Sequence, residues 1–112
     1  ELQEIGQSPE SIDAIEAQYM GVIKLSKYGC KVIKDVFDDC LRQGSLLGKN
    51  PKDAYMTDLL QEVINRDIKI RAIRMYKEWI EIDTVQDYKL ELTRDRVNLI
   101  DKSFGLLSQN KN

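Results

Sequence analysis

Histidine is absent from this sequence, and cysteine, proline and tryptophan are scarce. The 112 residues include two Cys, two Pro, one Trp and no His. The lack of histidine removes the usual general base of hydrolases that act through a serine or cysteine nucleophile. It also argues against a zinc site, because the remaining soft ligands, Cys30 and Cys40, are not closely spaced.

The two cysteines are too far apart for a disulfide bond. Cys30 and Cys40 lie ten positions apart on one predicted helix, which at the rise of an α-helix separates them by roughly 15 Å. We expect both to be reduced, partly buried thiols, as is usual for a cytoplasmic protein.

Neither charge of one sign nor long apolar runs are prominent. Lys and Arg number 17 and Asp and Glu 19, a net charge of -2, so there is no electrostatic reason to expect binding to nucleic acid or to an anionic membrane. No apolar run approaches the roughly 18 residues of a spanning helix. With 42% hydrophobic and 32% charged residues, the composition is that of a single globular domain.

Two segments have the pattern of buried helices. The first, residues 27–43, follows a candidate N-cap, Ser26, and ends at Gly44, which favours helix termination. Asn50-Pro51 opens the second, which we expect to end near Asp67. Apolar residues recur at helical spacing in both, and we expect a helical hairpin packed on a sheet; they are Val32, Ile33, Val36, Phe37, Cys40 and Leu41, then Met56, Leu59, Leu60, Val63 and Ile64.

Three further segments alternate in the manner of strands, namely residues 18–26, 68–75 and 80–82. A third helix is predicted from Val85 to about Lys102, followed by a flexible polar tail over residues 103–112. These elements predict an α/β fold, a few strands flanked by three main helices.

A capping box marks the start of the third helix. In Trp79-Ile-Glu-Ile-Asp-Thr-Val-Gln-Asp87, the Thr84 hydroxyl and the Asp87 carboxylate have the spacing for reciprocal bonds to the helix N-terminus. Asp83 stands between the predicted strand and this helix, the end of a strand where ligands bind in open α/β sheets. The alternative is that Asp83 only helps to cap the helix.

The same stretch resembles the closing motif of nucleotidyltransferases that join NTPs to phosphorylated small molecules. This family includes sugar-phosphate nucleotidyltransferases and the phosphocholine and 2-aminoethylphosphonate cytidylyltransferases. Two other segments, Glu16-Ala-Gln-Tyr-Met-Gly21 and Ala54-Tyr-Met-Thr-Asp-Leu-Leu60, are similar to family segments and occur in the family's order. The resemblance covers residues 9–90 and implies a partial Rossmann-like, GT-A-like nucleotidyltransferase fold.

The family's glycine-rich, basic nucleotide-binding loop has no counterpart here. The resemblance therefore implies that residues 1–102 are the C-terminal, acceptor-side part of such an enzyme, inactive alone. The complete enzyme would transfer a nucleotidyl group from an NTP, for which CTP is a candidate, to a phosphorylated or phosphonylated acceptor, releasing pyrophosphate.

Nucleotidyl transfer requires a divalent cation that neutralises charge on the phosphates, and Mg²⁺ takes carboxylate oxygens. The resemblance and the position of Asp83 make it the candidate metal ligand. Glu81, two residues earlier on the same face of the predicted strand, would assist the metal or merely close the site.

Candidate acceptor-binding residues lie on the other two segments. Tyr55 and Asp58 are three apart on one helical face, where a carboxylate and an aromatic ring would suit a substrate ammonium. The alternative is that Tyr55 packs and Asp58 supports the first turn. Gln18, Tyr19 and Gly21 are the remaining candidates, although Gly21 also suits a strand bulge.

A competing hypothesis from another class is a small α/β regulatory or interaction module with no metal or nucleotide site. Under the enzyme hypothesis, strands separated from their neighbours would leave an unpaired sheet edge. We therefore expect a homo-oligomer, most simply a two-fold dimer.

Overall fold

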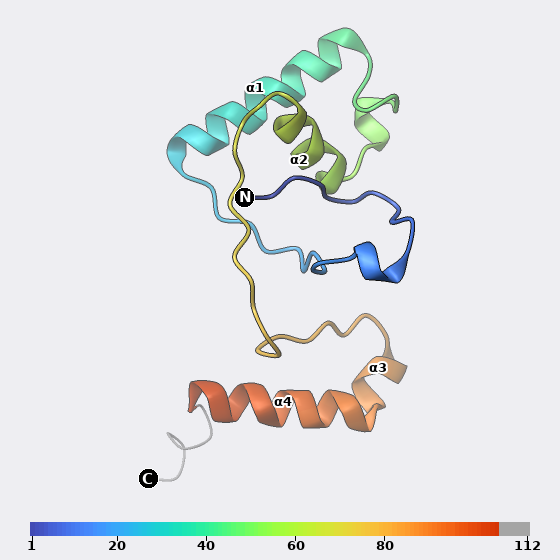
Figure 1. The fold of residues 1–112 in the computed structure, drawn as a ribbon, viewed down its shortest axis with the longest axis vertical. Helices are drawn as coiled ribbons and strands as arrows, with labels where there is room; N and C mark the ends of the chain where they lie inside the picture. Colours follow the sequence, from blue (N-terminus) through green and yellow to red (C-terminus); the bar gives the residue numbers. More distant parts are fainter. Residues whose placement is uncertain (106–112) are drawn as a thin grey trace. The chain divides into compact units, whose positions relative to one another are not determined.

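The computed structural model describes residues 1–105 and divides the chain into two compact units, Glu1–Ala72 and Ile73–Asn112. Each unit is described by itself (Figure 1). The first contains the helices of the predicted hairpin, and the second contains the capping box. Their elements, in order, are η1 Ile12–Ala14, α1 Lys27–Gln43, η2 Pro51–Asp53, α2 Met56–Asn65, α3 Val85–Lys89 and α4 Glu91–Phe104.

Helix α1 has the bounds that its sequence predicts. The Ser26 hydroxyl accepts a hydrogen bond from the Gly29 N–H at 3.0 Å, which satisfies one of the free donors of the first turn. At the other end, Gly44 adopts a left-handed conformation with φ +71°, which glycine adopts without steric cost. Both predicted caps are confirmed.

The second helix begins later than predicted. Asn50 does cap a turn, but the turn is the short 3₁₀ helix η2, and its side chain accepts from Lys52 N–H at 3.0 Å. Helix α2 begins only at Met56, where the Asp58 carboxylate accepts from the Tyr55 N–H at 2.8 Å. The sequence therefore contains two capping sites in succession. Asn50 caps η2, and the Asp58 carboxylate caps the start of α2.

The core of the first unit lies between α1 and α2, which lie side by side in Figure 1. Its buried members come from both helices and from the loop between them: Val36, Cys40, Leu46, Leu59 and Val63. Ile68 and Ile70 are partly buried against this cluster. The two apolar stripes thus pack on each other, and the sheet that we expected beneath them is not needed.

The α/β prediction is wrong: none of residues 1–105 forms part of a strand. Residues 18–26, 68–75 and 80–82 are irregular, and the single β bridge in the described part of the chain joins Leu46 to Lys49. Alternation specifies which side chains share a face, whereas a strand also needs a neighbour for its backbone N–H and C=O groups. The expected partial Rossmann-like, GT-A-like fold requires these strands, so that prediction is wrong as well.

The second unit contains a helical corner. The predicted helix from Val85 to Lys102 is divided at Leu90, whose ψ of 137° ends α3 and begins α4. The Thr93 hydroxyl donates to the Asp87 carbonyl oxygen across this corner, and Thr93 is the one buried residue of the unit's described part. The predicted tail overlaps α4 up to Phe104, and its remainder from residue 106 lies outside the described residues.

Both cysteines are free thiols, as predicted, but their surroundings differ. Cys40 is buried in the core, and burial raises the pKa of its thiol. Cys30 is exposed, contrary to the expectation of partial burial. Among the described helices, none is both long enough and apolar enough to cross a bilayer.

Candidate functional site

The predicted metal ligand Asp83 lies immediately before the capping box of α3. Asp87 accepts from the Thr84 N–H at 2.9 Å and from the Asp83 N–H at 3.2 Å, while Asp87 N–H donates to the Thr84 hydroxyl at 3.1 Å. Hydrogen bonding from the Thr84 side chain, followed by the bond from the Thr84 N–H, lowers the pKa of the Asp87 carboxyl. Asp87, and not Asp83, therefore provides the capping carboxylate.

The Asp83 carboxylate is left exposed, and it forms no hydrogen bond or ion pair within residues 1–105. Glu81 is likewise exposed on the segment that leads to it. Carboxylate oxygens of this kind are the donors that Mg²⁺ prefers, and Mg²⁺ commonly takes only one or two of them beside water and phosphate. No group of three or more potential metal-ligating side chains occurs in the described chain, so these residues fit part of a magnesium site and not a closed one.

Tyr55 and Asp58 both contact a cation, but this cation is the side-chain ammonium of Lys49. Lys49 Nζ lies 2.9 and 3.1 Å from the two Asp58 carboxylate oxygens and 5.4 Å from the centre of the Tyr55 ring. Asp58 is only 5% exposed. Its bond from the Tyr55 N–H, followed by the bond from Lys49, lowers the pKa of its carboxyl. Lys49 thus makes the two interactions predicted for a substrate ammonium.

Lys49 is the residue that the sequence patterns did not single out. A two-residue turn brings it to α2: Leu46 and Lys49 exchange backbone bonds of 2.9 and 3.0 Å around Leu47 and Gly48. Both central residues have positive φ, +47° and +78°, the geometry of a tight primed turn. In the sequence, the Leu47-Gly48 pair between Leu46 and Lys49 was the feature from which this turn could have been predicted.

The remaining acceptor candidates lie on an irregular segment of the same unit. Gln18 and Tyr19 are exposed, and Gly21 has φ +82° with open space around the position of a side chain. The glycine is therefore explained by its backbone conformation and not by close approach of another group. These residues belong to the first unit and Asp83 to the second.

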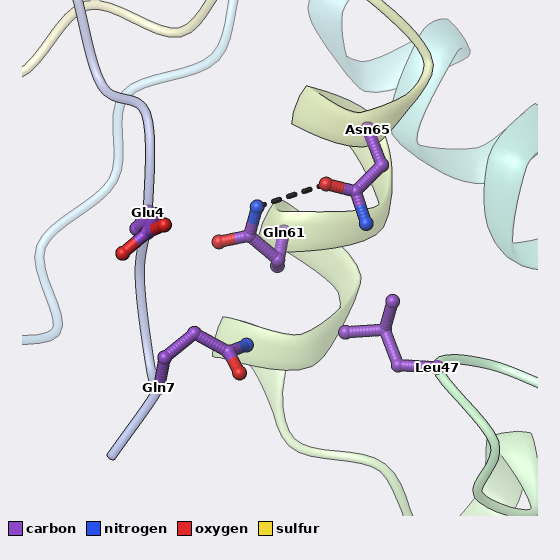
Figure 2. A pocket seen from close by; sticks show the side chains of 5 residues that line it. All are labelled: Glu4, Gln7, Leu47, Gln61 and Asn65. Atoms are coloured by element: carbon purple, nitrogen blue, oxygen red, sulfur yellow. Dashed lines mark hydrogen bonds between the residues drawn. The ribbon is translucent and has the colours of Figure 1, made fainter. Parts of the chain in front are cut away.

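An open pocket of about 350 Å³ occurs elsewhere in the first unit. Figure 2 shows Glu4 and Gln7 from the N-terminal segment facing Gln61 and Asn65 on α2, with Leu47 beside them. The Gln61 amide donates to the Asn65 side-chain oxygen at 3.0 Å. None of the predicted site residues lines this pocket.

Comparison with known proteins gives one informative similarity. The chain is 29% identical over 91 residues to the CTP:phosphoglutamine cytidylyltransferase of Campylobacter jejuni, an alignment that covers 81% of the chain and 36% of the relative. The chain is similar to a nucleotidyltransferase. It spans about a third of the length of this curated relative. Neither a protein-family model nor a solved structure matches the chain.

This similarity supports the resemblance carried by the three sequence segments at the level of nucleotidyl transfer. The relative is named for the use of CTP and phosphoglutamine in cytidylyl transfer.

Proposed function

We propose that the chain is the acceptor-side part of an enzyme that transfers a nucleotidyl group to a phosphorylated or phosphonylated small molecule. The similarity to a cytidylyltransferase carries this proposal and makes CTP the first nucleotide to test. It favours an enzyme over the small regulatory module that composition alone also allowed.

In this proposal Asp83 binds Mg²⁺ and Glu81 assists it or closes the site. A bound Mg²⁺ supplies charge neutralisation for the phosphates during transfer. The support from the chain is chemical: Asp83 is an exposed carboxylate that caps no helix and pairs with no described residue. Asp87 holds the adjacent backbone in place, so the carboxylate of Asp83 is fixed at its base and free at its end.

The acceptor side of the proposal rests on Gln18, Tyr19, Gly21, Tyr55 and Asp58. Because Lys49 already pairs with Asp58 and lies over Tyr55, an acceptor ammonium at this position has to displace the lysine. An acceptor without an ammonium would leave the pair intact. Acceptors that match except for the amino group therefore distinguish the two uses of these residues.

The test is pyrophosphate release by the product of the complete gene. Each of the four common NTPs is combined with phosphoglutamine, phosphocholine, 2-aminoethylphosphonate and a sugar phosphate, with and without Mg²⁺. We expect turnover with one acceptor class, CTP preferred, and dependence on Mg²⁺. The 112-residue chain alone should be inactive under the same conditions.

Two results would contradict the proposal. Absence of turnover for every pair with a folded, complete protein would remove the transferase assignment. Turnover by the purified 112-residue chain, freed of host enzymes, would show that the chain is self-sufficient and not the acceptor-side part.

A further inference from the structure

The open pocket of the first unit collects polar side-chain groups that are not used within residues 1–105. It is lined by Glu4, Gln7, Leu47, Gln61 and Asn65 (Figure 2). Within the described residues, the side chains of Glu4 and Gln7 form no hydrogen bond or ion pair, and the Asn65 side chain uses only its oxygen, which accepts from Gln61. A carboxylate and two carboxamides therefore have bonding capacity left for a ligand.

The backbone that carries Glu4 is fixed to α2. Gln61 Oε1 accepts from the Ile5 N–H at 2.8 Å, and Gln61 Nε2 donates to the Gln3 carbonyl oxygen at 3.3 Å. These bonds hold the chain on both sides of Glu4, and the buried side chain of Ile5 anchors the same segment. The position of the Glu4 carboxylate beside α2 is thus set by contacts that do not involve the carboxylate itself.

The remaining side of the pocket is also held in place. Leu47 lies in the tight turn closed by Leu46 and Lys49, and its side chain packs partly against the core. Asn65 is the last residue of α2, and its side chain is bound by Gln61 at 3.0 Å. Groups that are already in place lose less conformational freedom when a ligand binds, which favours binding.

The chemistry of the lining favours a small cation with a neutral polar group. Glu4 is the one charged side chain among the five that line the pocket, and a carboxylate forms its strongest bonds with cationic donors such as an ammonium. The carboxamides of Gln7 and Asn65 suit a neutral amide or hydroxyl, and Leu47 offers apolar contact to the carbons between the two groups. The volume of about 350 Å³ is at the small end of the range for small-molecule sites, roughly 300 to 1,000 Å³.

We propose that this pocket binds a small primary amine that also carries an amide or hydroxyl group. The ammonium of the ligand bonds to Glu4, and its neutral group bonds to the carboxamides of Gln7 and Asn65. The inference does not depend on the proposed transferase function, because none of the residues assigned to nucleotidyl transfer lines the pocket.

Three small probes test the proposal on the ¹⁵N-labelled 112-residue chain. The probe 3-aminopropanamide has both an ammonium and an amide, propylamine has only the ammonium, and propanamide has only the amide. In NMR titrations, 3-aminopropanamide should shift the side-chain amide signals of Gln7 and Asn65 with a Kd of about 1 mM, as expected of an open polar site. Each of the other two probes should bind at least about 10-fold more weakly, because each lacks one set of hydrogen bonds.

Glu4→Gln is the variant that tests the charged contact, since it keeps the size of the side chain and removes its charge. It should weaken the binding of 3-aminopropanamide at least about 10-fold. Glu10→Gln is the matched control, an exposed carboxylate further along the same segment that does not line the pocket, and it should bind as the wild type does. An unchanged Ile5 amide signal shows that the segment of Glu4→Gln is still held on α2.

Three results would overturn the proposal. The first is an absence of shifts at the Gln7 and Asn65 side chains up to about 10 mM 3-aminopropanamide, far above the expected Kd. The second is equal binding of propylamine, which would show ion pairing without recognition of the amide. The third is undiminished binding to Glu4→Gln, which would mean that the carboxylate does not hold the ammonium.

Discussion

At the scale of single residues, Asp58 is a carboxylate committed to holding the chain together. It receives the Tyr55 N–H and the Lys49 ammonium while almost entirely buried. Its pKa lies below the ordinary value of 3.8 in the folded chain. The stability that it contributes is therefore present at neutral pH and is lost as pH falls through the lowered pKa.

Asp58→Asn should reduce the free energy of unfolding at pH 7 by about 1 to 2 kcal/mol, since a helix-terminal bond and a charged bond are weakened together. The difference from the wild type should shrink as pH falls below about 4, where the wild-type carboxyl is protonated first in the unfolded chain and then, through its lowered pKa, in the folded chain. Urea unfolding followed by helical circular dichroism measures both quantities.

Asp53→Asn is the control for this pH dependence, because Asp53 lies in the neighbouring turn η2 but is exposed. Using a difference between proteins also removes the contributions of Asp39 and Asp87, whose carboxyl pKa values are lowered as well. A deficit of Asp58→Asn that stays constant from pH 7 to pH 3 would contradict the assignment of the lowered pKa.

Asp83 has the opposite character, an exposed carboxylate that supports no local structure. In the complete protein Asp83→Asn should lower turnover by about 10², the scale of removing one electrostatic stabiliser. The melting temperature should stay the same, because Asp87 and not Asp83 caps α3. Initial rates over a range of Mg²⁺ concentrations are the measurement, and Asp95→Asn, an exposed carboxylate on α4, is the control. Wild-type rates at limiting Mg²⁺ would exclude Asp83 as a metal ligand.

At the scale of elements, success in predicting structure from the sequence depended on whether the signal was local. The caps Ser26, Gly44 and Thr84 act within one turn of their own position. The two ends of α1 and the start of α3 were predicted, whereas the break between α3 and α4 was not. Residues 18–26 and 68–75 carry alternation, but a strand depends on a distant partner that the described chain does not provide. The same reason applies to the candidate site. Asp83 was proposed from its neighbours in the sequence, whereas the contacts of Lys49 and Gln61 join residues that only folding brings together.

The charged side of α1 illustrates a partner that the pattern did not reveal. Asp39 lies outside the apolar stripe of α1, yet it accepts from Arg66 Nη1 at 2.8 Å. Arg66 also donates through Nε to Glu62 at 2.9 Å and through Nη2 to the Cys40 sulfur at 3.7 Å. The guanidinium thus joins the end of α2 to the C-terminal part of α1, and its bond to Glu62 is the main cause that raises the pKa of Arg66.

Arg66→Met should therefore reduce the free energy of unfolding by about 1 to 2 kcal/mol, because a partly buried link between two helices loses its charged bonds. Lys31→Met removes an ion pair of similar length, but the Lys31 and Asp35 side chains are 72% and 57% exposed. The control should change stability little, because water screens an exposed ion pair. Urea unfolding of the two variants side by side makes the comparison, and equal effects would show that the Arg66 link contributes nothing special.

At the scale of the whole molecule, the two units differ in how much they bury. The first unit has an apolar cluster supplied by two helices and a turn, whereas Thr93 is the one buried residue in the described part of the second. Large apolar side chains of the second unit are exposed instead, among them Leu92 at 77%, Tyr88 at 67% and Phe104 at 57%. The sheet edge that predicted a dimer is absent from the described chain, and these side chains become the reason to expect a partner surface.

This difference predicts unequal stability along the 112-residue chain. Backbone amides in α4 should exchange with solvent deuterium about 10²-fold faster than those in α1, because local opening of α4 exposes little buried apolar surface. Hydrogen exchange measured by mass spectrometry, at a series of protein concentrations, provides both the rates and their dependence on association.

The Leu92→Lys variant is the control for association. At concentrations where the chain is monomeric, its α4 amides should exchange at the same rate as those of the wild type. If α4 is instead as protected as α1 at high concentration only, and Leu92→Lys removes that protection, its apolar face is covered by another copy. Equal protection at every concentration would mean that the second unit has a core of its own, contrary to the burial that its residues show.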